Sequence, residues 1–382
     1  MRINFKYILP PRLQAEISMT PTWKIKRELE RLKVQASAIP LAIYEPFLQR
    51  RYDPKRPELI KYIDGAVPAK DNLVIFLIYQ PNGLPASIID TCKHLVASGF
   101  APIIVSNMPL SDPDRIALTG SAHIVAERPN FGYDFGGYRD GLWLINLIGL
   151  NPKNILFLND SIWFPARENQ SLLTELLQPD LKYTGVQIFD NGSTGKVRSS
   201  MFGSYCFAVN ERLLKNSEFI DFWENYRLSS NKEITLRRGE RAFSNRMMKA
   251  TKNYRGIYSL ARFNAIIDDL KPDTLREALG DMIALAPYLE SRRLQLLNDK
   301  TTIHWINDAK DLLKEGAMTK NYIGSSPILS IREMGFPMIK KNNQRLYSLA
   351  RKRIILAVDE GRLGGLNSIV LAELRKQVGP LT

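Results

Sequence analysis

The amino-acid sequence predicts an α/β protein with a mostly parallel sheet flanked by helices. Four continuous apolar runs rich in β-branched residues lie between residues 72 and 158, and segments with helical periodicity separate them. Strands buried on both faces have such runs, and their alternation with helices at this spacing is typical of βαβ units. The four strands are expected at Asn72–Tyr79, Pro102–Ser106, Ala122–Ala126 and Asn154–Leu158.

The remaining elements follow from periodicity and from stop signals such as Gly99. Beyond about Ala265 the chain is predicted to be mostly helical, with breaks at proline and glycine. The other expected helices are Trp23–Val34, Ala86–Ser98, Asp112–Leu118, Phe135–Ile148, Glu211–Tyr226 and Arg241–Thr251, and the later strands are Thr184–Phe189 and Tyr205–Val209.

The chain divides into three parts by composition. Residues 1–70 form a basic and partly helical N-terminal extension, residues 71–265 form the α/β core, and residues 266–382 form a mostly helical C-terminal region. The net charge of +14 is concentrated in the flanks. Residues 1–70 carry 14 Lys and Arg against 7 Asp and Glu, and residues 341–382 carry 8 against 3.

Basic flanks suit nucleic acid, anionic lipid headgroups or a phosphorylated substrate. No nucleic-acid-binding motif or interleaved aromatic stripe accompanies them, so no nucleic-acid partner is expected. The sequence has no apolar run long enough to span a membrane and no signal-peptide cleavage pattern. Cys92 and Cys206 form no disulfide framework. We expect a cytoplasmic protein with peripheral contact to the anionic inner face of the membrane.

Ligands of open α/β sheets bind beyond the carboxyl ends of the strands. The segment ERPNFGYDFGGYRDG follows the third expected strand. Its glycines let a backbone approach a ligand, its Asn and Asp side chains accept hydrogen bonds, and its arginines suit phosphate. A glycine-rich turn that serves only the fold is the alternative. The candidate ligand-binding residues at the strand ends are Tyr79, Gln80, Ser106, Asn107, Arg128, Asn130, Gly132, Asp134, Gly136, Gly137 and Arg139.

The segment ILFLNDSIWFP places Asn159 and Asp160 at the end of the fourth strand. A carboxylate there is suited to ligate Mg²⁺ or Mn²⁺ bound to a diphosphate, because these hard cations take oxygen ligands. An Asx turn that ends the strand is the alternative. The segment GSTGKV at 192–197 fails the phosphate-loop pattern, and no GxGxxG follows the first strand.

Several segments together resemble the rhamnan synthesis protein F family of bacterial glycosyltransferases. They are ERPNFGYDFGGYRDGL and LFLNDSIWFP, followed in order by GSYCFAVN, FIDFW, GERAFSNRMMKA, TTIHW and GFPMIKK. The resemblance covers about residues 72–341. It implies a GT-A-like fold in which residues 71–265 bind a nucleotide sugar, with dTDP-L-rhamnose as the first donor and a glycan or lipid-linked glycan as the acceptor. The product would belong to a bacterial surface polysaccharide of the rhamnan, O-antigen or lipopolysaccharide type.

The resemblance also suggests roles for individual residues. The NDS segment would stand in place of the DxD motif, so that Asp160 and Asn159 hold a divalent cation and the diphosphate. His304, as a further metal ligand, or Lys340, as a nucleotide-sugar-binding residue, would reach the diphosphate from the C-terminal region. A packed histidine is the alternative for His304. Asn159 departs from the DxD pattern, and this departure motivates a second hypothesis, a non-catalytic glycan-binding subunit of a polysaccharide assembly system.

Inverting glycosyl transfer also needs a carboxylate that takes the proton from the acceptor hydroxyl. Glu240 is the first candidate for this base, and the alternative is that it stabilises a helix N-terminus. Asp190, after the strand Thr184–Phe189, is the second candidate, with a turn residue as its alternative.

Overall fold

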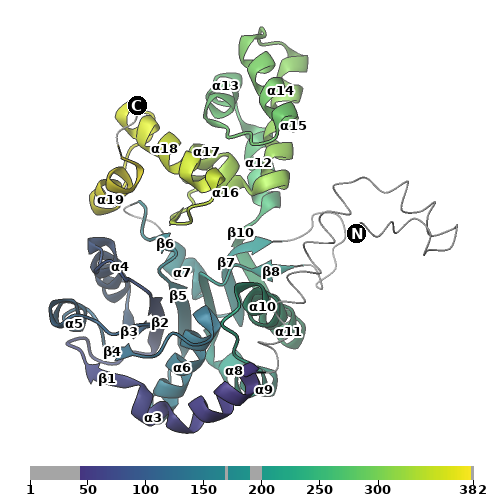
Figure 1. Cartoon of the computed structure of the whole chain (residues 1–382). Helices are drawn as coiled ribbons and strands as arrows, with labels where there is room; N and C mark the ends of the chain where they lie inside the picture. The colour runs from purple at the N-terminus through teal and green to yellow at the C-terminus, as the bar shows by residue number, and fades with distance from the viewer. Residues whose placement is uncertain (1–43, 168–170, 190–199, 380–382) are drawn as a thin grey trace, which may run out of the picture.

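A computed structural model describes residues 44–167, 171–189 and 200–379 of the chain. Its centre is a mixed sheet with the strand order β1-β4-β3-β2-β5-β9-β7-β10, and β8 pairs with β7 (Figure 1). The strands are β1 Lys61–Asp64, β2 Asn72–Ile78, β3 Phe100–Ser106, β4 Ile124–Glu127, β5 Asn154–Asn159, β7 Tyr183–Phe189, β8 Met201–Phe202, β9 Cys206–Asn210 and β10 Tyr254–Tyr258.

The four predicted strands form the parallel part of this sheet. β2 pairs in parallel with β3 and with β5, and β3 pairs in parallel with β4. β9 then runs antiparallel between β5 and β7, and β10 is parallel to β7. The prediction of a mostly parallel sheet flanked by helices is confirmed, and β10 is a strand that the sequence interpretation missed.

Helices cover both faces of the sheet, and the alternation of β2 separates the two layers. Val74 and Phe76 belong to the hydrophobic cluster that contains α4, Ala86–Ala97. Leu73 and Ile75 belong to the cluster on the other face, which contains α6, Tyr133–Leu147. Successive strand residues point to opposite faces, which explains this division.

Two glycines allow α6 to lie directly against β2. A Cβ atom on Gly137 would stand 2.2 Å from Leu77 Cδ1, and one on Gly141 would stand 2.6 Å from Ile75 Cγ2. Both distances are shorter than real carbon contacts, so only glycine permits this approach. The close packing fixes the first turn of α6 near the carboxyl ends of β2 and β5.

The helices of the core partly match the predicted ranges. The single helix expected over Glu211–Tyr226 is two helices, because the Asn216 side chain caps the second and accepts the Glu218 N–H at 2.9 Å. The helix expected from Arg241 continues without a break from a π-helical turn, η4. These elements are α5 Asp112–Thr119, α7 Leu172–Leu176, α8 Glu211–Leu214, α9 Ser217–Glu224, α10 Lys232–Thr235, η4 Leu236–Arg241 and α11 Ala242–Thr251.

The region after residue 265 is mostly helical, as predicted, and it forms the upper helices of Figure 1. One short strand, β11 Ile339–Lys340, returns to pair antiparallel with β6, Ile162–Trp163. The helices are α12 Leu260–Asp269, α13 Pro272–Asp281, α14 Pro287–Asn298, α15 Ile303–Lys320, α16 Tyr322–Ser325, α17 Pro327–Arg332, α18 Arg345–Asp359 and α19 Ser368–Val378.

The N-terminal region contributes to the core. β1 pairs antiparallel with β4 at the sheet edge, with Lys61 opposite Glu127. Between residue 44 and β1 the chain is helical over 44–52 and then forms η2 Asp53–Lys55 and α3 Arg56–Leu59. The helix predicted at Trp23–Val34 lies outside the described residues. Within the described parts of the chain, no helix has the length and apolarity to cross a membrane.

Candidate active site

The carboxyl ends of β2 and β5 and the first turn of α6 meet at one place. The Asp160 carboxylate accepts the backbone N–H of Tyr79 at 2.6 Å and Nε2 of Gln80 at 2.5 Å. Asn159 Nδ2 donates to Asp134 Oδ2 at 2.8 Å. The structure therefore brings together five of the residues that the strand-end argument selected.

Strand register and a helix start explain this meeting. Asn159 is the partner of Leu77 in the parallel pair of β2 and β5, so both strands end at the same level. Gly132, with a φ of 87°, turns the chain into α6 immediately before Asp134. The Asp134 carboxylate thus lies at the helix N-terminus and at the end of β5.

Glu240 supplies a third carboxylate from the π-helical turn η4. Its Oε1 accepts the backbone N–H of Ser204 at 2.9 Å, and Tyr138 Oη donates to the Ser204 carbonyl at 2.8 Å. α10 precedes η4, and Glu240 lies near the end of η4, so the alternative that it stabilises a helix N-terminus is wrong. Single π-helical turns inside helices are frequent at functional sites.

Two lysines reach the site from the C-terminal region. β11 pairs with β6 so that Lys340 stands opposite Ile162, and the Lys341 N–H donates to the Ser161 carbonyl at 2.9 Å. Lys340 Nζ lies 3.1 Å from the centre of the Tyr205 ring. Lys340 was predicted, whereas Lys341 and Tyr205 were missed, although both lie in segments that carry the family resemblance.

The three carboxylates titrate abnormally. The pKa of Asp134 is raised to about 6, chiefly by burial and also by the charges of Asp160 and Glu240, while the hydrogen bond from Asn159 opposes the rise. Burial also raises the pKa of Asp160, against hydrogen bonds and the charge of Lys341. Burial raises the pKa of Glu240, against the Ser204 hydrogen bond and the charge of Lys340.

The pKa values of the two lysines are lowered. Burial lowers the pKa of Lys340 to about 7, although the charges of Glu240 and Asp134 oppose the change. Burial also lowers the pKa of Lys341, against the charges of Asp160 and Glu373. The pKa values of Asp134 and Lys340 thus both lie near neutrality and their charges interact, and such perturbed groups cluster at functional sites.

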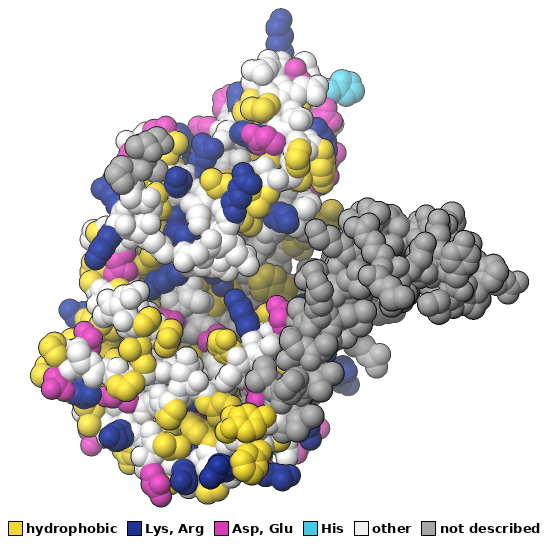
Figure 2. Space-filling view, viewed as in Figure 1, with side chains coloured by type: hydrophobic (Ala, Val, Ile, Leu, Met, Phe, Trp, Pro, Cys, Tyr) yellow, Lys and Arg dark blue, Asp and Glu magenta, His cyan; other side chains and the backbone are white. Residues whose placement is uncertain are grey.

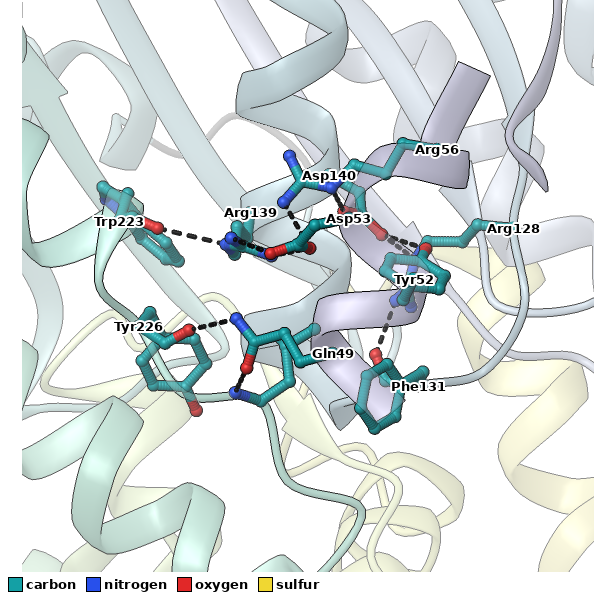
Figure 3. Close-up of polar contacts among 11 residues, drawn as sticks. Gln49, Tyr52, Asp53, Arg56, Arg128, Phe131, Arg139, Asp140, Trp223 and Tyr226 are labelled. Atoms are coloured by element: carbon teal, nitrogen blue, oxygen red, sulfur yellow. Dashed lines mark hydrogen bonds and ion pairs between the residues drawn. The ribbon is translucent and has the colours of Figure 1, made fainter. Parts of the chain in front are cut away.

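The guanidinium of Arg128 is held in hydrogen bonds within the protein. It donates to Asp140 Oδ2 at 2.6 Å and to the Phe131 carbonyl at 2.5 Å (Figure 3). It also donates to Asn107 Oδ1 at 2.5 Å. Tyr52 Oη donates to the same Asp140 oxygen at 2.6 Å. The residue is only 2% exposed, so the prediction that Arg128 holds phosphate charge has to be corrected.

The guanidinium of Arg139 is also held in hydrogen bonds within the protein. It donates two hydrogen bonds to the Asp53 carboxylate, at 2.7 and 2.9 Å, and a third to the Trp223 carbonyl at 3.1 Å (Figure 3). Arg56 contacts both Asp53 and Asp140 and closes the network. The buried arginines thus join helix α6 to the segment before β1, and Arg139 is not placed to bind phosphate.

The glycines before and in α6 are also explained by packing. A Cβ atom on Gly132 would stand 2.7 Å from Leu228 Cδ2, and one on Gly136 would stand 2.2 Å from the Phe131 carbonyl oxygen. With Gly137 against Leu77, all three face protein atoms, as in the alternative of a turn that serves the fold. We therefore give them no ligand-binding role.

The other candidates lie elsewhere. Ser106 Oγ donates to the Met108 carbonyl at 2.7 Å, Asn107 is held by Arg128, and Asn130 is exposed in the loop before α6. His304 lies in the first turn of α15, an 18-residue helix. Because such a helix is about 27 Å long and its last turn precedes Asn321, which contacts Gln187 of the sheet, the structure does not bring His304 to Asp160. Asp190 lies outside the described residues.

The donor set fits a divalent cation only in part. Asn159 Oδ1 already accepts the N–H and Oγ of Ser161, and among the described residues no group of three His, Cys, Asp or Glu side chains is arranged to hold a metal. Asp134 and Asp160, however, are half-buried carboxylates whose charges repel each other. Mg²⁺ is often held by one or two carboxylates plus substrate phosphates. Asp160 and Asp134 could supply that share.

Comparison with known proteins identifies the family. A family model described as "Rhamnan synthesis protein F" matches residues 102–303, just over half of the chain. The chain belongs to the rhamnan synthesis protein F family. The match confirms the resemblance found in the sequence. The matched range contains Asp134, Asn159, Asp160 and Glu240, whereas Lys340 lies beyond it.

A second comparison finds a relative that is similar over nearly the whole chain. An uncharacterized protein, y4gN, of Sinorhizobium fredii is 28% identical over 367 residues, which cover 94% of this chain and 93% of the relative. The similarity thus extends beyond the residues that the family model matches.

Solved structures with some similarity to this rhamnan synthesis family chain are glycosyltransferases. The mannosyltransferase Ktr4p of S. cerevisiae is 9% identical, with a TM-score of 0.26, over 43% of this chain and 62% of Ktr4p. The mannosyltransferase PcManGT of Pyrobaculum calidifontis, in complex with GDP-Man and Mn²⁺, is 12% identical, with a TM-score of 0.26. The match covers 90% of this chain and 98% of PcManGT. S. aureus TarS is 11% identical, with a TM-score of 0.31, and the match covers 80% of this chain and 53% of TarS. The chain thus spans less than two thirds of Ktr4p and of TarS, and scores this low assign no role to any residue.

Proposed function

We propose that this chain is an inverting glycosyltransferase of the GT-A type. It transfers a sugar from a nucleotide-sugar donor, with dTDP-L-rhamnose as the first candidate, to a growing bacterial surface polysaccharide. The observation that carries the proposal is that Lys340 interacts by charge with Glu240 and Asp134, and that Asn159 joins Asp134 to the strand end that holds Asp160. Membership of the rhamnan synthesis protein F family supports the same reaction class.

The lysines stabilise the leaving group in this proposal. The diphosphate gains negative charge when its bond to the anomeric carbon breaks, and the electron pair of that bond stays on the phosphate oxygen. Lys340 and Lys341 supply positive charge from a partly desolvated position, where electrostatic stabilisation is strong. A divalent cation held by Asp160 and Asp134 would add charge to the same phosphates.

Glu240 is the proposed general base. The acceptor hydroxyl oxygen forms the new bond to the anomeric carbon while its proton passes to the Glu240 carboxylate. The Ser204 N–H fixes the orientation of that carboxylate, and burial raises its pKa toward neutrality. A base is most effective when its pKa lies near the working pH. Tyr79, whose side chain is 48% exposed beside Asp160, is the proposed platform for the nucleotide base.

The acceptor is proposed to be a glycan or a lipid-linked glycan, presented at the inner face of the membrane. The basic flanks support this placement because lipid carriers and anionic membranes both present phosphate.

The test is release of nucleotide from dTDP-, UDP-, GDP- and CMP-sugars, followed by chromatography, with an oligosaccharide acceptor and with or without Mg²⁺ or Mn²⁺. Glu240→Gln should lower kcat by about 10²- to 10⁴-fold and leave the Kd of the nucleoside diphosphate nearly unchanged. Glu233→Gln, at an exposed position on α10, is the matched control and should retain full activity. A wild-type protein that binds oligosaccharide but releases nucleotide from none of these donors would instead be a non-catalytic glycan-binding subunit.

A further inference from the structure

A groove of about 480 Å³ lies between α14 and α18 in the C-terminal helical region. One face of α18 forms a wall of it. Arg345, Leu349, Lys352, Arg353 and Leu356 all line the groove, at intervals of four, three, one and three residues. This spacing places them on one side of a helix, where basic and apolar side chains alternate. The opposite side of α18 is buried in the core, through Leu346, Ala350, Ile354 and Ala357.

The groove carries an excess of positive charge. Glu290 on α14 is held by Arg293, with contacts of 2.7 and 2.8 Å, so these two charges compensate each other. Arg345 and Lys352 are exposed, and within the described residues neither forms an ion pair with a carboxylate. The groove therefore presents uncompensated cations, which favour an anionic partner. Figure 2 shows Lys and Arg side chains among hydrophobic ones over these helices.

The groove is also apolar. Leu285 and Leu349 line it half-buried, from the segment before α14 and from α18, and Leu356 is 36% exposed on the α18 side. Outside the groove, α14 exposes two further large apolar side chains, Tyr288 at 52% and Leu294 at 49%. A free phosphate would use only the cations, whereas a phospholipid would use the cations for its headgroup and the apolar surface for its chains.

The composition argues against a nucleic acid in this groove. Single-stranded nucleic acids bind through aromatic side chains that stack on their bases. Among the described residues, those that line the groove include no aromatic side chain. An anionic lipid remains the partner whose chemistry uses both the charges and the apolar surface.

α18 also connects the groove to the candidate active site. Arg351, next to Lys352 but on the buried side of the helix, donates to the carbonyls of Lys340 at 3.0 Å and Asn342 at 2.7 Å. The helix whose outer face lines the groove thus holds the backbone that carries Lys340. A membrane bound at the groove would lie at a fixed position relative to the site.

We propose that the groove between α14 and α18 binds the headgroups of anionic phospholipids and docks the protein on a bilayer surface. The orientation of the site toward a membrane-borne acceptor rests on the proposed function, whereas the lipid binding itself does not.

The test is co-sedimentation of the full chain with vesicles of phosphatidylcholine containing 30% phosphatidylglycerol (about one lipid in three), compared with pure phosphatidylcholine. The double variant Arg345→Glu/Lys352→Glu should lower the vesicle partition coefficient at least about tenfold, because each basic residue near such a surface contributes measurably. Lys93→Glu/Lys249→Glu changes the net charge equally at exposed positions outside the groove and should bind like wild type. Leu356→Ser should weaken binding without changing the charge.

Three results would overturn the proposal. They are equal binding of the groove and control double variants, no preference of the wild type for anionic vesicles, and full competition by millimolar inorganic phosphate at constant ionic strength. The last would identify free phosphate as the ligand. Nucleoside diphosphate affinity is measured on the same variants in solution, so that failure of lipid binding and failure of the proposed glycosyl transfer are distinguished.

Discussion

The side-chain amide of Asn159 donates a hydrogen bond to the Asp134 carboxylate across 2.8 Å and so joins the end of β5 to the first turn of α6. The oxygen of that side-chain amide accepts two hydrogen bonds from Ser161, one from its backbone N–H and one from its hydroxyl. Asn159 therefore acts as a fixed bridge between two acidic segments. This position explains how an asparagine can stand beside Asp160 where the DxD pattern has an aspartate: a third carboxylate there would face Asp134 without a hydrogen-bond donor.

The bridge predicts a change in titration. Asn159→Ala removes a donor that lowers the pKa of Asp134, so that pKa should rise further above about 6. The measurement is the pH dependence of the Asp134 carboxyl carbon signal by NMR with selective labelling. Asn154→Ala removes a comparable hydrogen bond, to Asn72, at the opposite end of β5 and should leave the titration unchanged. An unshifted titration in Asn159→Ala would mean that the bridge does not form in solution.

Asp134 should reduce the stability of the fold at neutral pH. Its folded pKa, about 6, lies above its ordinary value of 3.8, so its favourable contribution is present at low pH and is lost as the pH rises through the folded value. Asp134→Asn should raise the free energy of unfolding by about 1–3 kcal/mol at pH 8 and by about half as much at pH 5. Urea denaturation at both values measures this, with the exposed Asp311→Asn as the control. A gain that does not depend on pH would point to packing instead.

Lys340 should make nucleotide binding depend on pH. Its pKa of about 7 means that the cationic form, which attracts diphosphate, is lost as the pH rises above neutrality. Wild-type affinity for a nucleoside diphosphate should therefore fall between pH 6 and pH 8.5 in isothermal titration calorimetry. Lys340→Arg stays charged over this range and should bind with a flat profile, and Lys340→Met should bind weakly at both values. A wild-type profile shared by Lys340→Met would exclude Lys340 as the titrating group.

The arginine network behind α6 should matter for folding and not for ligand binding. Removing Arg128 leaves the buried Asp140 carboxylate with only the hydrogen bond from Tyr52 and the longer ion pair with Arg56, at 3.5 Å. Breaking a buried ion pair costs on the order of 3–5 kcal/mol. Arg128→Met should thus lower the free energy of unfolding by about that amount, while the folded protein keeps its nucleotide affinity. The joint replacement Arg128→Met/Asp140→Leu should recover part of the loss. Loss of nucleotide binding without loss of stability would restore a phosphate-binding role for Arg128.

The sequence predicted the strands, and the strand ends at which candidate residues meet, for a simple physical reason. Buried parallel strands have long apolar runs, and their carboxyl ends lie at one edge of the sheet. Polar residues that directly follow those runs, such as Gln80 and Asp160, were therefore found. Local order along the chain was sufficient for these predictions.

The predictions failed for residues whose position or partners depend on tertiary contacts. Arg128 and Arg139 have the composition of phosphate ligands, but their carboxylate partners include Asp53, which is distant in sequence. Lys341 reaches the site through the pairing of β11 with β6. A strand of two residues has no sequence pattern by which it could be predicted. His304 was chosen from a short motif, although the long helix that begins there carries it away from the sheet.

The measurement that tests the central claim most directly is a thermal-shift titration of dTDP, UDP, GDP and CMP against wild type and Asp160→Asn, with and without Mn²⁺ or Mg²⁺. A ligand that binds only the folded state raises the melting temperature with its concentration. We predict a selective, saturable shift with one nucleotide, dTDP first, that is reduced in Asp160→Asn and retained in the exposed control Asp311→Asn. The absence of a shift with every nucleotide, in the presence of metal and of an oligosaccharide acceptor, would contradict the proposal of a nucleotide-sugar site.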